Sequence, residues 1–585
     1  MLYYILICLL RISIQLTLAD EADEQREYDA LFQEMMKCNP STAAFAISVV
    51  KDGKVVVNKA YGKANREKGI DATIDTRFSI GSISKEFTGY MAGKQVQEKH
   101  YDWNDKITDI FAKKGIKMSL QGDFRNRTCT LEDALTHRTG IKMYDWLLTD
   151  DRNISRANWV TKYVPLFQEE KEMRSAFYYN NWLYTVVGYL VEIFGGKTFE
   201  EQVKESMFKP LDMTQTCFVS DKEFDQLKDG EFAQPYQEGG GDPDNRTLYP
   251  VPKRAMKYIG VHNPAGGIIS TSGDMAKYMI AVIDAFNDKE GAKLSKAVLE
   301  DVTDPKTLMK IQLGDATRIE KPTFDATFKD SGYGYGHIIG TYRGYKYVNH
   351  GGSTYGHYSY ITVIPSLNIG VFTVISGNNY LSKDMWRMQK PMHIYMLDKM
   401  MGEEMWLNAT NICTFPQTWI KEDTQVFEGA KRGAEAEGAT AVPAGDAERI
   451  VGNYSNPVFP VLMLKLEESS LKVRFQKIKI LLQFEMGNSN GSVVAIKQEG
   501  DQEKRLRVIL NMPVDPLNLP DTEKAEAFVY YLDNSSKMST NQIEKIELEL
   551  GPERYPFKRN CSTSTASHHL TLLLIGALIF QLLHN

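Results

Sequence analysis

Apolar and polar positions along the chain follow patterns that predict strands on both sides of a helical middle. Near the amino end, β-rich runs at 44–50 and 55–57 flank Asp52-Gly53, a pair typical of a tight hairpin turn. Two further β-rich runs, 358–365 and 368–376, form a second expected hairpin. The segment 22–36 is amphipathic, and helical periodicity marks three segments: 84–98, 181–194 and 274–286. We therefore expect one mixed α/β domain whose sheet joins segments far apart in the sequence.

The composition changes after residue 418. Within 419–446 the chain turns to Glu, Ala, Gly and Lys with few large apolar side chains, which indicates a linker. Beyond it, 447–559 alternates short β-rich runs with turns, the pattern of a small all-β barrel or sandwich. The expected fold class is accordingly α/β over 20–418, followed by an all-β domain.

Length and composition narrow the range of functions. A chain of 585 residues with 43% hydrophobic residues is globular and long enough for two domains. Its 69 basic and 75 acidic residues give a net charge of −6 without a long basic cluster, which argues against a nucleic-acid partner. The histidines and cysteines show no H-E-x-x-H, H-x-H or C-x-x-C spacing, so we expect neither a protein-built metal site nor a cofactor.

Both ends of the chain carry sorting patterns. Residues 1–19 form an apolar run before an acidic stretch, as in a cleaved secretory signal, although Arg11 interrupts the run. At the other end, 560–585, small residues and a short polar spacer precede the apolar stretch 570–583. This is the layout of a glycosylphosphatidylinositol attachment signal, with Asn560 as the expected attachment site; a short tail anchor or a buried helix is the alternative. We expect a protein of the secretory pathway, either tethered to the outer face of the cell membrane or extracellular.

Glycosylation triplets and cysteines fit the same compartment. N-x-S/T triplets, which are modified only in a secretory compartment, begin at Asn126, Asn153, Asn245, Asn408, Asn453, Asn490, Asn534 and Asn560. Leaving out the signal and the carboxyl end, four cysteines remain: Cys38, Cys129, Cys217 and Cys413. This even number permits two disulfides in an oxidising compartment, with the pairing left open.

The first candidates for chemistry are Ser82 and Lys85, an S-x-x-K motif at the expected start of the helix over 84–98. Residues three apart lie on one helix face, so the Lys85 amine can help to take the proton of the Ser82 hydroxyl. Unpaired backbone N–H groups at a helix N-terminus would also stabilise an anion beside Ser82. Alone the motif is weak, because a capping serine followed by a solvated lysine has the same spacing.

A second motif, Y-x-N, places Tyr179 and Asn181 just before another expected helix. A phenol held near an ammonium loses its proton more readily, so Tyr179 can act as a base toward Ser82 and later as an acid toward the leaving group. Asn181 offers an amide that can bind a substrate amide. An ordinary capping turn is the structural alternative.

A third motif is the glycine-rich run Val348–Gly356, which leads into the second expected hairpin. Glycines such as Gly352 let a substrate backbone approach an edge strand closely. The backbone N–H of Ser353 joins that of Ser82 in the expected oxyanion hole. His350 supplies a cation or a hydrogen bond. A plain hairpin turn with a structural histidine is the alternative.

Together and in this order, the motifs resemble the penicillin-recognising serine hydrolases of the class C β-lactamase and D-Ala-D-Ala carboxypeptidase type, including their animal β-lactamase-like relatives. The resemblance covers 44–379. It includes three further blocks that are similar to family motifs: Leu135-Thr136-His137-Arg138-Thr139-Gly140-Ile141, Pro264–Met275 and Tyr333-Gly334-Tyr335-Gly336. The segment beginning Ile450-Val451-Gly452-Asn453-Tyr454 looks like the lipocalin-like β-barrel that follows this domain in several relatives.

The resemblance implies a β-lactamase/transpeptidase-like sandwich, in which an antiparallel sheet with helices is joined to a helical subdomain, followed by a small lipocalin-like barrel. It implies that Ser82 is the acylated nucleophile. Lys85 and Tyr179 act as a coupled acid–base pair, because the assignment of the base is disputed for this chemistry. Asn181 is implied as a ligand for the acyl-side amide, and His350 as the group facing the far end of the substrate. An ester on Ser82 forms first, and water then attacks it.

One departure from the family pattern bears on the substrate. Lactamases of the family commonly have K-T-G where this chain has His350-Gly351-Gly352, while histidine occurs there in peptidase and esterase relatives. Because histidine is only partly charged at neutral pH, we expect weaker and more pH-dependent binding of a substrate carboxylate. Hydrolysis of β-lactam antibiotics is therefore in doubt.

Two functions stay open at this point. The first is a serine hydrolase that acts on a small peptide, D-amino-acid amide or ester. The second is a non-catalytic extracellular binding or matrix protein that keeps the fold, because a fold alone does not give a function. The sequence predicts no particular oligomeric state for either.

Overall fold

The computed structural model describes residues 23–144, 154–239, 247–309, 318–320, 327–377 and 388–414, and strand backbones beyond them. The chain divides into two compact units, Met1–Lys431 with Ile480–Gln483, and Arg432–Lys479 with Phe484–Asn585. The predicted signal, linker and attachment signal lie outside the described residues.

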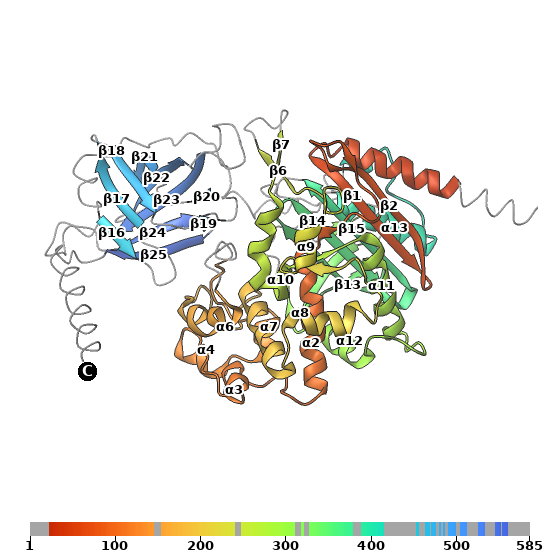
Figure 1. Ribbon diagram of the computed structural model, residues 1–585, viewed down its shortest axis with the longest axis horizontal. Coiled ribbons are helices and arrows are strands. Elements are labelled where there is room, and N and C mark those ends of the chain that lie inside the picture. Colours follow the sequence, from red (N-terminus) through yellow and green to blue (C-terminus); the bar gives the residue numbers. More distant parts are fainter. Residues whose placement is uncertain are drawn as a thin grey trace, which may run out of the picture. The chain divides into compact units, whose positions relative to one another are not determined.

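A large antiparallel sheet forms the centre of the first unit (Figure 1). Among the described residues ten strands belong to it, in the spatial order β10-β11-β12-β13-β14-β15-β1-β2-β3, with β9 beside β11. Their bounds are β1 Thr42–Lys51, β2 Lys54–Asn65, β3 Ile70–Asp71, β9 Thr307–Leu308, β10 Arg318–Glu320, β11 Thr327–Tyr333, β12 Ile338–Tyr342, β13 Tyr345–Thr354, β14 His357–Ile364 and β15 Ile369–Gly377. Because β1 pairs with β15, with Phe45 opposite Ile375, the sheet joins distant segments as predicted.

Both predicted hairpins are present. Asp52 and Gly53 connect β1 to β2 with φ angles of 50° and 75°, the left-handed geometry that a two-residue hairpin turn requires. β14 and β15 are joined through η7 (Pro365–Leu367) and Asn368, whose φ is 56°. Asp and Asn tolerate this conformation better than other non-glycine residues, so local turn chemistry fixes both connections.

The three predicted helices begin and end within two residues of their expected bounds, and the amphipathic segment forms a first helix over 23–37. The longer labelled helices are α2 Ser84–Gln97, α7 Asn181–Gly195, α11 Ser272–Phe286 and α13 Gln389–Met401. The shorter ones are α3 Ile107–Ala112, α4 Asp123–Thr128, α5 Leu131–Leu135, α6 Arg156–Asn158, α8 Phe199–Val203, α9 Lys222–Gln226, α10 Asn263–Gly266 and α12 Lys296–Val302. Side-chain caps explain two of the starts, because Asn180 accepts from the backbone N–H of Trp182 and Thr271 accepts from that of Asp274.

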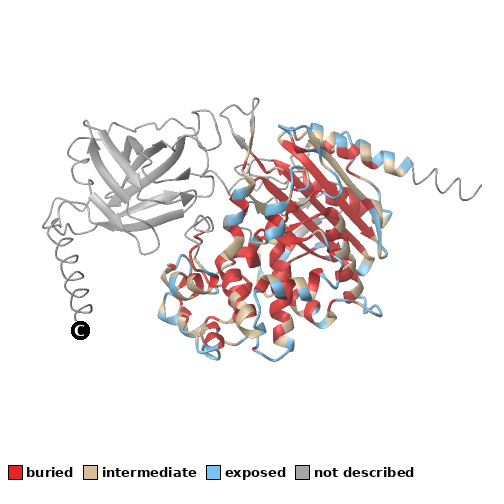
Figure 2. Ribbon diagram, in the orientation of Figure 1, coloured by how far each residue is buried: buried red, intermediate tan, exposed pale blue. Residues whose placement is uncertain are grey.

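Helices cover both faces of the sheet. Successive side chains of a strand point to opposite faces. Phe45 of β1 packs in one cluster with Tyr28 of the first helix and Met392 of α13. On the other face α11 lies against β15, where a Cβ added to Gly370 would come 2.9 Å from the sulfur of Met279. The central strands are therefore buried on both sides, as Figure 2 shows.

Helices α3 to α8 form a helical subdomain beside this sheet, and α7 of the subdomain packs against α2 (Figure 1). Two small sheets complete the first unit, one of β4 Phe78–Ser79, β8 Ile268–Ser270 and β5 Cys217–Phe218, the other of β6 Tyr236–Gly239 and β7 Thr247–Pro250. The first unit is thus an α/β domain with a large antiparallel sheet and a helical subdomain.

The second unit contains strands only, among the residues that are described there. Each strand pairs antiparallel with the next and β25 returns to β16, which closes a barrel. The barrel strands are β16 Gly452–Ser455, β17 Leu462–Glu467, β18 Ser470–Phe475, β21 Asn490–Gln498, β22 Glu503–Asn511, β23 Lys524–Leu532, β24 Lys545–Leu550 and β25 Glu553–Arg559.

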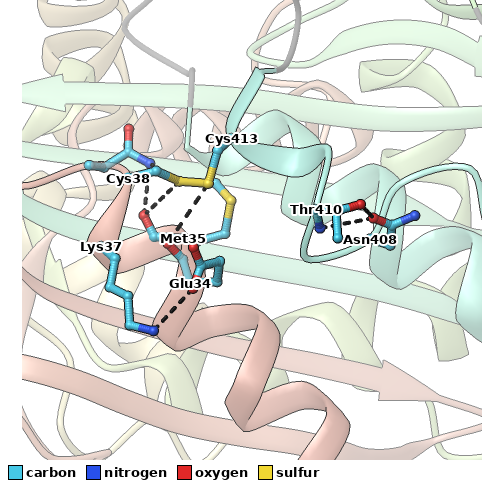
Figure 3. The surroundings of a disulfide bond; sticks show 8 residues. Glu34, Met35, Lys37, Cys38, Asn408, Thr410 and Cys413 are labelled. Atoms are coloured by element: carbon cyan, nitrogen blue, oxygen red, sulfur yellow. Dashed lines mark hydrogen bonds and ion pairs between the residues drawn. A yellow bond between two sulfur atoms is a disulfide. The ribbon is translucent and has the colours of Figure 1, made fainter.

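A disulfide joins Cys38 to Cys413, with their Cα atoms 5.8 Å apart (Figure 3). It ties the residue after the first helix to the turn η8 (Ile412–Thr414). Cys129 and Cys217 are buried free thiols, so the described cysteines form one of the two disulfides that their number permits. The reason is their placement, because Cys129 follows α4 in the helical subdomain and Cys217 begins β5 in a separate apolar cluster.

Of the predicted glycosylation sites, the described side chains are those of Asn126 and Asn408. Asn408 is exposed, and its Oδ1 accepts from Thr410 through the backbone N–H at 2.9 Å and through Oγ1 at 2.6 Å (Figure 3). Asn126 lies within α4 and accepts from the Leu120 N–H at 2.9 Å. In the described ranges, no helix has both the length and the apolar character that a membrane crossing needs.

Candidate active site

Ser82 lies in η1 (Gly81–Ile83), the turn that leads directly into α2. Lys85 is in the first turn of α2, and its Nζ donates a hydrogen bond to Ser82 Oγ at 2.9 Å. Ser82 is partly exposed, whereas Lys85 is completely buried. The S-x-x-K spacing therefore places a reachable hydroxyl in front of a buried amine.

Two acceptor oxygens, besides that of Ser82, lie within hydrogen-bond distance of the Lys85 amine. Its Nζ lies 2.6 Å from Asn181 Oδ1 and 2.7 Å from the carbonyl oxygen of Ala265. Both oxygens can only accept, so two N–H bonds of the lysine point at them. The direction toward Ser82 is then filled by the third N–H of an ammonium or by the lone pair of a neutral amine. This geometry allows a proton to pass between Ser82 and Lys85.

The two oxygens that bind Lys85 come from α7 and α10. These helices pack closely with α2 because residues at their contacts are small. Asn181 is the first residue of α7, directly after the capping Asn180. α10 lies between α2 and α7: Thr88 Oγ1 donates to the Pro264 carbonyl at 2.6 Å, and a Cβ on Gly188 would overlap the Pro264 ring. Ala265 was not among the predicted site residues, although it lies in a block that resembles a family motif.

The ring of Tyr179 lies close to the Lys85 amine. The Lys85 Nζ is 4.9 Å from the centre of the Tyr179 ring and 5.3 Å from that of Tyr184, distances at which an aromatic face attracts a cation. Tyr179 and Asn181 are both partly exposed, like Ser82. The structure thus brings Ser82, Lys85, Tyr179 and Asn181 together around one buried nitrogen.

Strand β13 forms the opposite wall and approaches Ser82 through glycines. Gly81 has a φ of 50°, and a Cβ added there would lie 2.6 Å from the Ser353 backbone nitrogen. A Cβ on Gly352 would overlap the Ile80 carbonyl oxygen. Gly352 therefore has a packing role, beside the substrate contact that the sequence predicts. The Ser353 N–H lies next to the residue that precedes Ser82, as an oxyanion hole built from both would require.

His350 is buried on this wall and makes a hydrogen bond through each ring nitrogen. Its Nδ1 lies 2.7 Å from the Gly351 carbonyl oxygen, which only accepts, so Nδ1 carries the hydrogen. Its Nε2 lies 3.0 Å from the Tyr333 hydroxyl and accepts from it. Burial, together with the charge of Lys85, lowers the pKa of His350 to about 3. The expectation of a partly charged His350 is therefore corrected: the imidazole is neutral and both nitrogens are occupied.

Tyr333 was not predicted as a site residue. It lies in the block Tyr333-Gly334-Tyr335-Gly336, so resemblance to the family marked the segment but not its contact with His350. As for metals, no group of three or more His, Cys, Asp or Glu residues in the described part of the chain is placed to hold an ion.

A serine paired with a buried lysine at the start of a helix, beside a large antiparallel sheet, defines a serine-hydrolase type of site. The family model described as beta-lactamase matches residues 28–387, which is more than half of the chain. The chain therefore belongs to the beta-lactamase family of serine hydrolases.

Three similar proteins illustrate the range of the family. Gigasin-6 of Magallana gigas is 28% identical over 234 residues, which cover 40% of this chain and 74% of gigasin-6. The unguisins hydrolase ungD' of Aspergillus campestris is 28% identical over 331 residues, covering 55% of this chain and only 57% of the fungal protein. The octameric penicillin-binding protein homologue of Pyrococcus abyssi shares the fold with a TM-score of 0.51 at 20% identity, over 92% of this chain and 99% of its own.

Proposed function

We propose that the protein hydrolyses a small peptide, D-amino-acid amide or ester through an acyl-enzyme on Ser82. The observation that carries the proposal is the position of Lys85 Nζ, 2.9 Å from Ser82 Oγ and held by Asn181 and Ala265. A merely structural lysine has no need of a partly exposed serine as its partner. The name of the fungal relative, a hydrolase, supports the same class of reaction.

The proposed reaction has two steps. Ser82 Oγ attacks the substrate carbonyl while its proton passes to the Lys85–Tyr179 pair, and a C–O bond forms. The N–H groups of Ser82 and Ser353 stabilise the oxyanion, and the pair returns the proton to the departing amine or alcohol. Water then attacks the ester carbonyl and gives a proton to the same pair. The acyl C–O bond to Ser82 breaks, the acid product leaves, and the pair returns the proton to Ser82 Oγ.

The strand wall favours a substrate without charge beyond the scissile bond. A carboxylate needs a hydrogen-bond donor or a cation, and His350 gives its hydrogen to Gly351 and its lone pair to Tyr333. We therefore place esters, amides and blocked peptides before free D-Ala-D-Ala acids and β-lactam carboxylates as substrates.

A fluorophosphonate probe tests the proposal against the non-catalytic alternative. The expected result is covalent labelling of the purified protein that disappears in Ser82→Ala. Ser84→Ala is the matched control, because the Ser84 hydroxyl is buried and accepts from the Ile268 N–H at 3.1 Å. No labelling of the wild type at saturating probe would favour a binding or matrix protein, and equal labelling of Ser82→Ala would show that the nucleophile is another residue.

We also propose the secretory route, the lipid anchor at Asn560, and a lipocalin-like identity for the barrel of the second unit. The disulfide between Cys38 and Cys413 supports an oxidising compartment, and the exposed Asn408 side chain supports glycosylation. Phosphatidylinositol-specific phospholipase should release the protein from expressing cells. Retention in the membrane fraction would instead favour a tail anchor.

A further inference from the structure

His137 occupies an unusual backbone position next to the site. It follows α5 and has a φ of 59°, in the left-handed region that residues other than glycine adopt uncommonly, although histidine does so more often than most. The side chain is buried. Such a conformation persists only when the surrounding contacts fix it, so the contacts of His137 indicate what the residue does.

His137 holds the backbone on both sides of Tyr179. Its carbonyl oxygen accepts from the Tyr178 N–H at 2.7 Å. Its Nδ1 accepts from the Asn180 N–H at 3.0 Å, which places the ring hydrogen on Nε2. The residue that carries the proposed acid–base group is thus fixed by the same histidine before and after its own Cα.

The imidazole also fixes the Tyr179 ring. The two ring centres are 4.2 Å apart with an angle of 35° between the planes. Phe177 and Tyr333 pack on the same imidazole, at 5.3 Å and 4.9 Å between ring centres. Burial, with the nearby charge of Lys85, lowers the pKa of His137 well below its usual value, so the ring remains neutral.

We infer that His137 is a positioning residue that aims the Tyr179 hydroxyl at the Ser82–Lys85 pair. The inference rests on the proposed function, since it assigns His137 to the acylation step. The neutral His137 side chain acts in two ways: its Nδ1 accepts a hydrogen bond from the Asn180 N–H, and its ring packs against the ring of Tyr179. His137 itself neither takes up nor releases a proton in the reaction.

Three substitutions separate the parts of this role. His137→Asn keeps an acceptor at the position of Nδ1 and tolerates positive φ, but it removes the ring. His137→Phe keeps a ring and leaves the Asn180 N–H without its acceptor. His137→Leu removes both. We expect His137→Leu to slow fluorophosphonate labelling of Ser82 by about 10-fold to 100-fold, the usual scale for a misplaced catalytic group. His137→Asn and His137→Phe should each lose less.

A double-mutant cycle with Tyr179→Phe distinguishes positioning from general destabilisation. If His137 acts through Tyr179, adding His137→Leu to Tyr179→Phe should slow labelling further by less than about 3-fold. With a p-nitrophenyl ester, His137→Leu should lower kcat and leave KM within about 2-fold. His393→Leu is the matched control, because His393 is equally buried but its partners are Thr362 and Thr373.

The outcomes are separable. Wild-type labelling that His137→Leu leaves unchanged overturns this inference alone, and so does an equal loss in both Tyr179 backgrounds. If His137→Leu does not fold, the same cycle is run with His137→Asn, where a loss of about 3-fold or more that disappears in Tyr179→Phe supports the inference and an unchanged rate overturns it. A wild-type protein that is never labelled at Ser82 overturns the proposed function and this inference with it.

Discussion

The two walls of the candidate site differ in the ionisable side chain that each of them buries. The helical wall, built by α2, α7 and α10, holds the buried amine of Lys85 among oxygen acceptors. The strand wall, built by β13, holds a buried imidazole, His350, whose nitrogens are both occupied. In the proposed reaction, the helical wall moves a proton at the nucleophile, and His350 on the strand wall faces the substrate without a charge.

Burial also changes the protonation of a carboxyl in α2, that of Glu86. Glu86 follows Lys85 in α2, yet burial raises the pKa of its carboxyl to about 8, and it accepts from the Tyr278 hydroxyl at 2.8 Å. Glu86 is thus mostly protonated at neutral pH. Burial thus disfavours the charged form of both the Glu86 carboxyl and the His350 imidazole.

The largest effect should come from removing the amine of the helical wall. Lys85→Met keeps the length of the side chain and removes the proton carrier, so we expect the rate of ester hydrolysis to fall by ~10³-fold to ~10⁴-fold. The control is Lys94→Met on the same helix, whose Nζ is bound to Ser206 Oγ at 3.1 Å. Steady-state kinetics check the prediction, and activity within 10-fold of the wild type would contradict it.

Selectivity should change when a cation is placed on the strand wall. We compare a D-dipeptide that ends in a free carboxylate with the same peptide ending in an amide. The wild type should prefer the amide, and His350→Lys should move the ratio of kcat/KM toward the acid by about 10-fold or more, the scale of a charged hydrogen bond. His350→Gln is the neutral control. A wild type that prefers the acid would show that another group binds the carboxylate.

A third prediction concerns stability rather than rate, and involves the buried carboxyl of Glu86 in α2. The folded-state pKa of Glu86 is raised above its ordinary value of 4.5 to about 8. Its contribution to stability is therefore full below pH 4.5 and is lost as the pH rises through 8. Relative to Glu86→Gln, the wild type should lose about 1.4 kcal/mol of unfolding free energy per pH unit between these values.

Urea unfolding at pH 5, 6 and 7 measures this difference. All seven tryptophans lie at or before residue 419, so their fluorescence reports on the first unit. Glu98→Gln, at the exposed end of α2, serves as the control. Parallel stability curves for the wild type and Glu86→Gln would show that Glu86 is ionised in the folded protein.

The sequence predicts the helical wall better than the strand wall for a physical reason. The spacing of Ser82 and Lys85 is set within one helical turn, and the start of α7 is set by the neighbouring Asn180, so local rules suffice. The state of His350 depends on Tyr333 and on the distant Lys85, which only the folded sheet brings near. A single sequence contains no local signal for such contacts.

The same distinction applies to the fold. The turn at Asp52-Gly53 and the helix over 84–98 follow from short patterns, and both are present. The pairing of Cys38 with Cys413 could not be predicted, because it depends on where two ends of the domain meet. Likewise, the carbonyl of Ala265 reaches Lys85 only through the packing of α10 between α2 and α7.

Mass spectrometry of protein quenched during turnover tests the central claim most directly. With an ester that the protein hydrolyses, the account predicts a peptide containing Ser82 that is heavier by the mass of the acyl group and returns to its original mass when the substrate is exhausted. Continued turnover with Ser82 unmodified at every time point, or turnover by Ser82→Ala at the wild-type rate, would contradict the account.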